Sequence, residues 1–293
     1  MSSRQESHTL FYQEPSMASL KRRLWAQEAS IDIIFLDGTP AQQSKVMRGF
    51  EEWGHYVNLK FTQAPCADLG IQISFSGKCS TSRVGTWCLH VTRGTPAMTF
   101  SEIDGENSDW TDDERGTILR EVGHALGFAH EHHNPDCKEI LTSKQGSISK
   151  DDAKTQDRSE EVMNVNVTNV SDEMTMKTHT VFDHASIMGY PIDAPCDDQE
   201  IITPSGTELS SFDKAFAMAH YPRLIPHRDT PEWTIEHAFT VLGVPEDTQN
   251  QILRSTNPKT IFRSFDAWNK KRIKQVRNAQ KQAEGDEGHD TIG

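Results

Sequence analysis

The most restrictive feature of this sequence is the run of residues 120–130, Arg-Glu-Val-Gly-His-Ala-Leu-Gly-Phe-Ala-His. Residues four apart lie on one face of a helix, so position 120 and His124 would point the same way, with Glu121 beside them. Gly127 suits the end of such a helix, and the turn that follows would bring His130 back toward His124. Two imidazoles and a carboxylate at this spacing indicate a zinc site whose carboxylate is a general base. The full pattern has a third imidazole at position 120, where this chain has arginine.

Length and charge limit the organisation of the chain and its partners. The chain has 293 residues and a formal net charge of −13. One domain of about 200 residues with an extension fits this length better than two equal domains. Residues 1–222 contain 19 basic and 33 acidic residues, whereas residues 223–293 contain 11 and 10. The acidic part lacks the basic face that nucleic acid requires, so we expect no nucleic-acid partner.

The N-terminal residues and the cysteines bear on localisation. Residues 1–27 lack the apolar run of a signal peptide, and no stretch approaches the roughly 20 apolar residues of a membrane span. We therefore expect a cytoplasmic protein without a membrane span, with secretion by a non-standard route left open. The five cysteines are scattered, which predicts free thiols in a reducing compartment. Export would make a Cys79–Cys88 or a Cys137–Cys196 bridge plausible.

The first hundred residues predict a sheet with one helix. Residues 41–53 have helical spacing, with apolar side chains on one side. The flanking apolar segments are short and bounded by Gly, Pro, Asp and Ser, as strands are. In chain order the strands are predicted at 31–36, 57–61, 69–75, 87–91 and 97–100.

A second helix is predicted from Asp112 to Leu126. Thr111 with Glu114 three residues later is the signature of a capping box, which starts a helix. The pattern of residues 120–130 begins in the last two turns of this helix. That setting makes the pattern more specific, because short strings of this kind also arise by chance.

The rest of the chain is divided by composition. Residues 1–24 form a polar tail, and residues 138–178 look like a long surface excursion. After residue 222, helical signals predict an extension over residues 223–283, followed by a disordered tail over residues 284–293. The last predicted helix of the extension is rich in Lys and Arg, which most simply indicates a solvent-facing surface. A role in docking to a membrane surface or a partner is the less favoured alternative.

With these residues in place, the chain resembles the metzincin clan of zinc endopeptidases, most closely its astacin-like microbial members. A second segment supports this, because Ser186-Ile187-Met188-Gly189-Tyr190-Pro191 looks like the Met-turn that underlies the zinc site of the clan. The resemblance covers about residues 25–222, is weak over 138–178, and departs from the usual pattern at Gly189, where members often have His.

The resemblance implies an α+β, zincin-like (metzincin) fold. Such a fold has a mixed, mostly parallel twisted sheet, an active-site helix and a Met-turn, and here it would be followed by the helical C-terminal extension. The resemblance also implies Zn²⁺ as cofactor and a peptide or protein substrate, which aligns on an edge strand. We place that edge at residues 87–91. The oligomeric state does not follow from the sequence.

Carried over residue by residue, the resemblance gives each motif residue a role. Glu121 would be the catalytic base, and His124 and His130 would be zinc ligands. The alternative is that these two are hydrogen-bonded core histidines, and a further histidine could replace a ligand: His132, His133 or His184.

The same resemblance assigns the supporting residues. Tyr190 would stabilise the oxyanion, Met188 would form the floor of the site, and Gly127 would provide the turn. Arg120 stands at the missing ligand position and does not bind the metal.

Arg120 decides what activity we expect. A guanidinium has no lone pair for a metal, and a unit charge about 4 Å from Zn²⁺ would be repelled by roughly 8 kcal/mol at an effective dielectric constant of about 20. The resemblance implies a zinc-dependent metalloendopeptidase that hydrolyses peptide bonds with metal-activated water, an activity that Arg120 opposes. The alternative is a catalytically impaired pseudoprotease that binds peptides or proteins. A structural or regulatory module acting through the extension is a third possibility.

Overall fold

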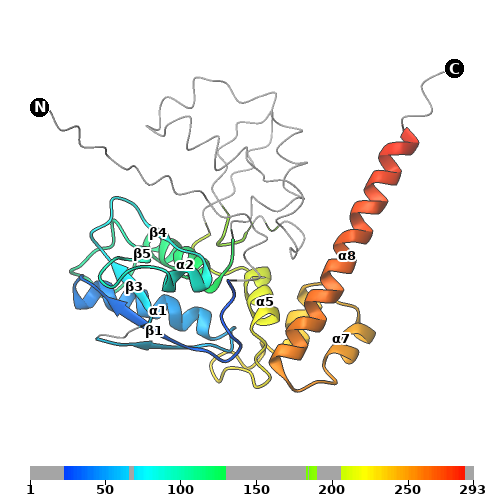
Figure 1. Ribbon diagram of the computed structural model, residues 1–293, viewed down its shortest axis with the longest axis horizontal. Helices are drawn as coiled ribbons and strands as arrows, with labels where there is room; N and C mark the ends of the chain where they lie inside the picture. The colour runs from blue at the N-terminus through cyan, green and yellow to red at the C-terminus, as the bar shows by residue number, and fades with distance from the viewer. Residues whose placement is uncertain (1–22, 66–68, 130–182, 184, 190–205, 288–293) are drawn as a thin grey trace, which may run out of the picture.

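A five-stranded sheet forms the centre of the fold (Figure 1). The computed structural model describes residues 23–65, 69–129, 183, 185–189 and 206–287. The strand order is β2-β1-β3-β5-β4, with all pairs parallel except the antiparallel pair of β4 and β5. The predicted mixed, mostly parallel sheet of an α+β fold is therefore confirmed. The strands are β1 (Ser30–Phe35), β2 (Lys60–Gln63), β3 (Ile71–Ser74), β4 (Thr81–Ser82) and β5 (Met98–Thr99).

Helices α1 (Pro40–Gly54) and α2 (Asp112–Leu126) pack against each other and complete the core. The Trp53 indole donates a hydrogen bond to Leu119 O at 2.9 Å and so joins the two helices. Both helices present apolar faces because their buried residues recur at helical spacing. The central strands and these helices share one core: Ile33, Ile71, Ile73, Val46, Phe50, Ile118 and Val122 are fully buried.

Two strand predictions were wrong in position or type. The strand expected at 57–61 begins at Lys60, because the apolar Val57 belongs to the turn after α1, where its N–H donates to Trp53 O at 3.2 Å. The expected edge strand at 87–91 is instead a 3₁₀ helix, η2 (Gly85–Leu89), which begins at a glycine with a φ of 55°. The edge strand on this side of the sheet is β4, which pairs with β5.

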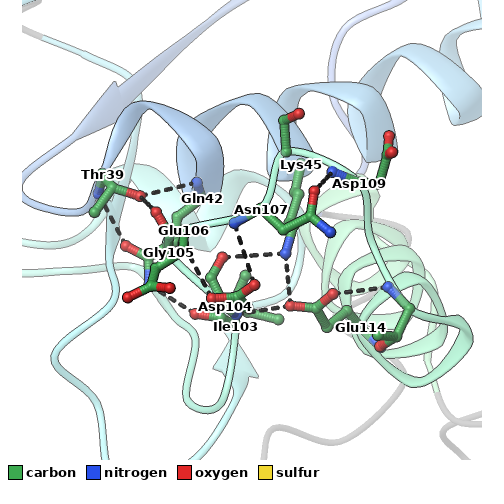
Figure 2. Close-up of polar contacts among 12 residues, drawn as sticks. Thr39, Gln42, Lys45, Ile103, Asp104, Gly105, Glu106, Asn107, Asp109 and Glu114 are labelled. Atoms are coloured by element: carbon green, nitrogen blue, oxygen red, sulfur yellow. Dashed lines mark hydrogen bonds and ion pairs between the residues drawn. The ribbon is translucent and has the colours of Figure 1, made fainter.

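A buried ion pair attaches the start of α2 to α1 (Figure 2). Lys45 Nζ lies 2.8 Å from Glu114 Oε1 and also donates to Asp104 O at 3.1 Å. Glu114 accepts the backbone N–H groups of Asp104 and Thr111 at 2.7 and 2.8 Å, while the Thr111 hydroxyl accepts the Glu114 N–H. The predicted capping box is therefore present. Burial raises the pKa of Glu114, but these hydrogen bonds outweigh it and leave the pKa below its usual value.

The C-terminal part is helical, as predicted. Helix α5 (Ser211–His220), which the sequence pattern did not reveal, is followed by α6 (Ile235–Val241), α7 (Glu246–Ile252) and α8 (Pro258–Glu287). Phe265 of α8 is buried and stacks on Phe239 of α6 at 5.5 Å between ring centroids. Helix α8 continues past the predicted end at residue 283 and projects well beyond the rest of the molecule (Figure 1). No helix among the described residues is both long and apolar enough to cross a membrane.

Candidate active site

The end of helix α2 fixes the orientation of His124. Gly127 is the C-cap with a φ of 104°, and the turn that it makes brings Phe128 back over the helix. The Nδ1 atom of the buried His124 lies 2.9 Å from Phe128 O. A carbonyl oxygen can only accept, so Nδ1 carries the proton of the neutral ring and Nε2 carries the lone pair. This tautomer is suited to metal binding through Nε2.

Glu121 lies on the same helix, one turn before His124, and is buried. Its Oε2 atom has no hydrogen-bond partner among the described residues. Burial raises the pKa of Glu121 to about 7, against the opposing effect of the Arg120 charge. A carboxyl group with this pKa exchanges protons readily near neutral pH, which is the property of a general base.

Arg120 reaches across to the segment that contains Met188. Its Nε–H donates a hydrogen bond to Ile187 O at 3.0 Å. The guanidinium therefore lies between helix α2 and the residue 185–189 turn, at the position where the motif has a histidine. It cannot supply a ligand, because it has no lone pair and keeps its proton in proteins.

Met188 packs directly beneath helix α2. A Cβ atom built on Gly123 would lie 2.5 Å from Met188 Sδ and 3.2 Å from Trp53 Cζ2. Only glycine at position 123 therefore allows the methionine to approach the helix this closely. Met188 is 4% exposed, so the contact belongs to the core beneath Glu121 and His124.

Asp213 holds the residue 185–189 turn from below. Its carboxylate accepts a hydrogen bond from Ser186 Oγ at 2.7 Å and another from the Ile187 N–H at 2.8 Å. It also accepts the Ser210 N–H at 3.0 Å and thereby caps α5. Burial raises the pKa of Asp213 to about 6, although these hydrogen bonds favour the charged form. The Ser210/Asp213 spacing of a capping box was the available signal for this residue.

Two aromatic residues satisfy the carbonyl groups at the end of α2. The Tyr221 hydroxyl donates to Leu126 O at 2.6 Å, and the Trp25 indole donates to Ala125 O at 2.8 Å. The last carbonyls of a helix have no partners within it, so these bonds stabilise the turn at Gly127. Sequence reasoning did not find this support, because it joins residues that are 95 and 100 positions apart.

The structure thus brings together Glu121, His124, Gly127 and Met188, with Arg120 at their edge. Other predicted site residues lie outside the described residues: His130, Tyr190 and the substitute ligands His132, His133 and His184. The lone pair of His124 and the unpaired carboxylate oxygen of Glu121 fit a zinc site, whereas Arg120 does not. Cys79 and Cys88 are both free thiols, and burial raises the pKa of Cys88 to about 12.

Solved structures of known proteins share this fold. One structure of myroilysin superposes with a TM-score of 0.57 at 25% sequence identity, covering 70% of this chain and 98% of that chain. A second myroilysin structure gives 0.50 at 26% identity, covering 69% and 86%. High choriolytic enzyme 1, a hatching enzyme zinc-protease from Oryzias latipes (Medaka fish), gives 0.44 at 16% identity, covering 68% and 94%, which is too low to support an argument.

Sequence comparison identifies the family. No curated protein matches the chain significantly. The family model described as Astacin, a peptidase family, matches residues 17–212, which is more than half of the chain and includes α2 and the residue 185–189 turn. The chain therefore belongs to the astacin family of zinc-dependent metallopeptidases.

Proposed function

We propose that this chain is a peptide-binding member of the astacin family whose own hydrolytic activity is strongly reduced by Arg120. The observation that carries the proposal is the 3.0 Å hydrogen bond from Arg120 Nε to Ile187 O, because it puts a cation without a lone pair at a ligand position. A missing ligand should weaken zinc binding by more than the roughly 10- to 100-fold that follows loss of a group that only supports a ligand.

Peptide binding is expected at the free side of β4. Membership of a peptidase family implies peptide substrates. Among the described strands, β4 pairs only with β5, so its other edge is available to an extended peptide by strand addition. This edge replaces the one that the sequence pattern suggested at residues 87–91.

The retained residues define what a complete site would do. Zinc held there would supply a Lewis acid for the scissile carbonyl and for its water. Glu121 would accept the proton of the attacking water and pass it to the leaving amine. His124, and by the motif His130, would hold the metal, and Tyr190 would stabilise the oxyanion. Among the ligand and catalytic positions, position 120 alone departs from the family pattern.

An active zinc metalloendopeptidase of low turnover is the second candidate. Its support is Glu121, which remains buried beside His124 with a pKa of about 7. A chain without any hydrolytic role has no chemical reason to keep a buried carboxyl group there, because burying an ionisable group without a partner destabilises the fold.

Casein cleavage in the presence of zinc separates the two candidates. We expect Arg120→His to cleave casein more than about 100-fold faster than the wild type, since restoring a ligand restores tight zinc binding. Arg120→His/Glu121→Gln is the matched control and should return to background. A wild-type rate within about 100-fold of that of Arg120→His, sensitive to chelator and lost in Glu121→Gln, would instead establish the active enzyme of low turnover.

A further inference from the structure

A second group of potential metal ligands lies away from helix α2. His55, His227 and Asp229 each offer one ligand atom, and these three atoms lie within 4.8 Å of one another. His55 is the C-cap of α1, whereas His227 and Asp229 lie in the segment between α5 and α6. These last two residues follow residue 212, where the family match ends, so the group is not part of the family pattern.

The rings of His55 and His227 stack on each other. Their centroids are 4.3 Å apart with an interplanar angle of 24°, and two stacked imidazolium cations at this separation would repel each other. Burial lowers the pKa of His55, as do His227 and Arg223, while Asp229 and Glu52 work in the opposite direction. A metal ligand requires a nitrogen lone pair, which a neutral imidazole offers.

A lone pair and a carboxylate face each other within the group. The Asp229 N–H donates a long hydrogen bond to His227 Nδ1 at 3.3 Å, so that nitrogen carries a lone pair, and a metal bound there would replace this hydrogen bond. The same nitrogen lies 3.6 Å from Asp229 Oδ2, which is too far for a direct hydrogen bond. Two electron-rich atoms at this distance repel, and a cation between them would turn the repulsion into attraction.

Two nearby arginines direct their nitrogens to other acceptors than Asp229 Oδ2. Arg228 Nε lies 3.3 Å from Asp229 Oδ1, so the other carboxylate oxygen, Oδ2, is the one that faces His227. Arg223 directs its Nη2 to Gly54 O and Val57 O at 2.9 and 2.7 Å, around the end of α1. The carbonyl end of a helix also carries partial negative charge, which favours a cation beside His55.

We propose that His55, His227 and Asp229 bind a divalent transition metal, zinc above all, and thereby fasten the segment leading to the C-terminal helices onto helix α1. Two imidazoles and one carboxylate are a set that zinc prefers, whereas Ca²⁺ and Mg²⁺ prefer oxygen alone. Zinc with bonds of about 2.0 Å needs ligand atoms roughly 3.3 Å apart in a tetrahedral site, so small side-chain rotations complete the site. The proposal is independent of the function of helix α2.

Zinc titration of the full-length His124→Ala protein tests the site without the contribution of helix α2. We expect one zinc per chain, and at least a 10-fold weaker dissociation constant when His55→Ala or Asp229→Asn is added. Asp229 is 53% exposed in its side chain, so its replacement leaves the fold intact. His237→Ala, in an exposed histidine of α6, is the matched control and should leave the affinity unchanged. An affinity that neither His55→Ala nor Asp229→Asn alters would overturn the proposal.

Trypsin provides a second readout at the same place. Arg228 lies between the two ligands His227 and Asp229 and is 88% exposed, but cleavage after it requires local opening of the segment. Zinc at about 100 times its dissociation constant should slow this cleavage about 100-fold in the His124→Ala protein, because only the closed form binds the metal. At the same zinc concentration, cleavage in His124→Ala/His55→Ala should be slowed by about 10-fold or less, because the weaker site is less occupied. Equal slowing in both proteins, or slowing in neither, would contradict the metal site.

Discussion

At the scale of single residues, Arg120 and Glu121 determine what the end of helix α2 can do. Arg120 stands where the motif has its first histidine and donates a hydrogen bond to the Ile187 carbonyl, which ties the helix to the turn that contains Met188. Glu121 keeps its buried position and an oxygen without a partner among the described residues. The motif itself placed both side chains, but their partners come from residues that no local pattern connects to them.

Glu121 should make the stability of the metal-free protein depend on pH. Burial raises its pKa from 4.5 to about 7, so the folded state binds a proton that the unfolded state releases. A raised pKa means that stability is fully present below pH 4.5 and is lost as the pH rises toward 7. The loss amounts to about 3 kcal/mol. We therefore expect Glu121→Gln to raise the free energy of unfolding at about pH 8 by this amount and to change little at about pH 4. A difference in unfolding free energy between Glu121→Gln and the wild type that is the same at both pH values, measured by urea unfolding, would contradict this.

The buried pair of Lys45 and Glu114 should be essential to the position of α2. Lys45→Met leaves the Glu114 charge buried without its partner, which should cost about 3–5 kcal/mol of unfolding free energy. Arg48→Met is the matched control on the same helix, because Arg48 is 42% exposed and lies 3.9 Å from Asp109. It should cost less than about 1 kcal/mol. Similar losses in both variants, measured by urea unfolding, would show that the pair is not responsible.

At the scale of elements, local signals predicted α2 well and longer-range features poorly. The Thr111/Glu114 spacing and Gly127 marked both ends of the helix, because caps are local contacts. The apolar residues of 87–91 suggested a strand, but the left-handed Gly85 starts a 3₁₀ helix instead. The pairing of Lys45 with Glu114, 69 residues away, and of Asp213 with the Ile187 N–H, 26 residues away, depends on tertiary structure that spacing does not encode.

The contact between Gly123 and Met188 gives a test at this scale. Gly123→Ala would put a Cβ 2.5 Å from Met188 Sδ, and overpacking of this kind typically costs about 1–3 kcal/mol. In the Met188→Ala background the clash with the sulfur is absent and only the 3.2 Å approach to Trp53 Cζ2 remains, so the gain in helix propensity, up to about 1 kcal/mol, offsets more of the cost. A double-mutant cycle on thermal unfolding should therefore show coupling above about 1 kcal/mol. Additive effects would mean that the two residues do not touch.

At the scale of the whole molecule, an astacin-family domain carries a helical extension that packs on α5. The strands and the helical C-terminal part were predicted from local apolar patterns, whereas the mixed sheet followed from the resemblance to the astacin-like peptidases. Helix α5 was not predicted. Its Phe216 and His220 contact each other at 4.0 Å between ring centroids, and His220 lies 5.5 Å from Phe262 of α8 by the same measure, so α5 joins the extension to the domain. The proposed His55/His227/Asp229 site joins the end of α1 to the segment between α5 and α6. Zinc added to the wild type would therefore report on two sites at once.

The affinity for zinc of the site on helix α2, measured in the His55→Ala protein so that the second site is weakened, tests the central claim most directly. We predict that adding Arg120→His tightens zinc binding more than about 100-fold, because a ligand replaces a cation, and that His124→Ala then abolishes the gain. Zinc binding by the His55→Ala protein that is already as tight as in the restored protein, and is lost in His124→Ala, would show that Arg120 does not disable the site.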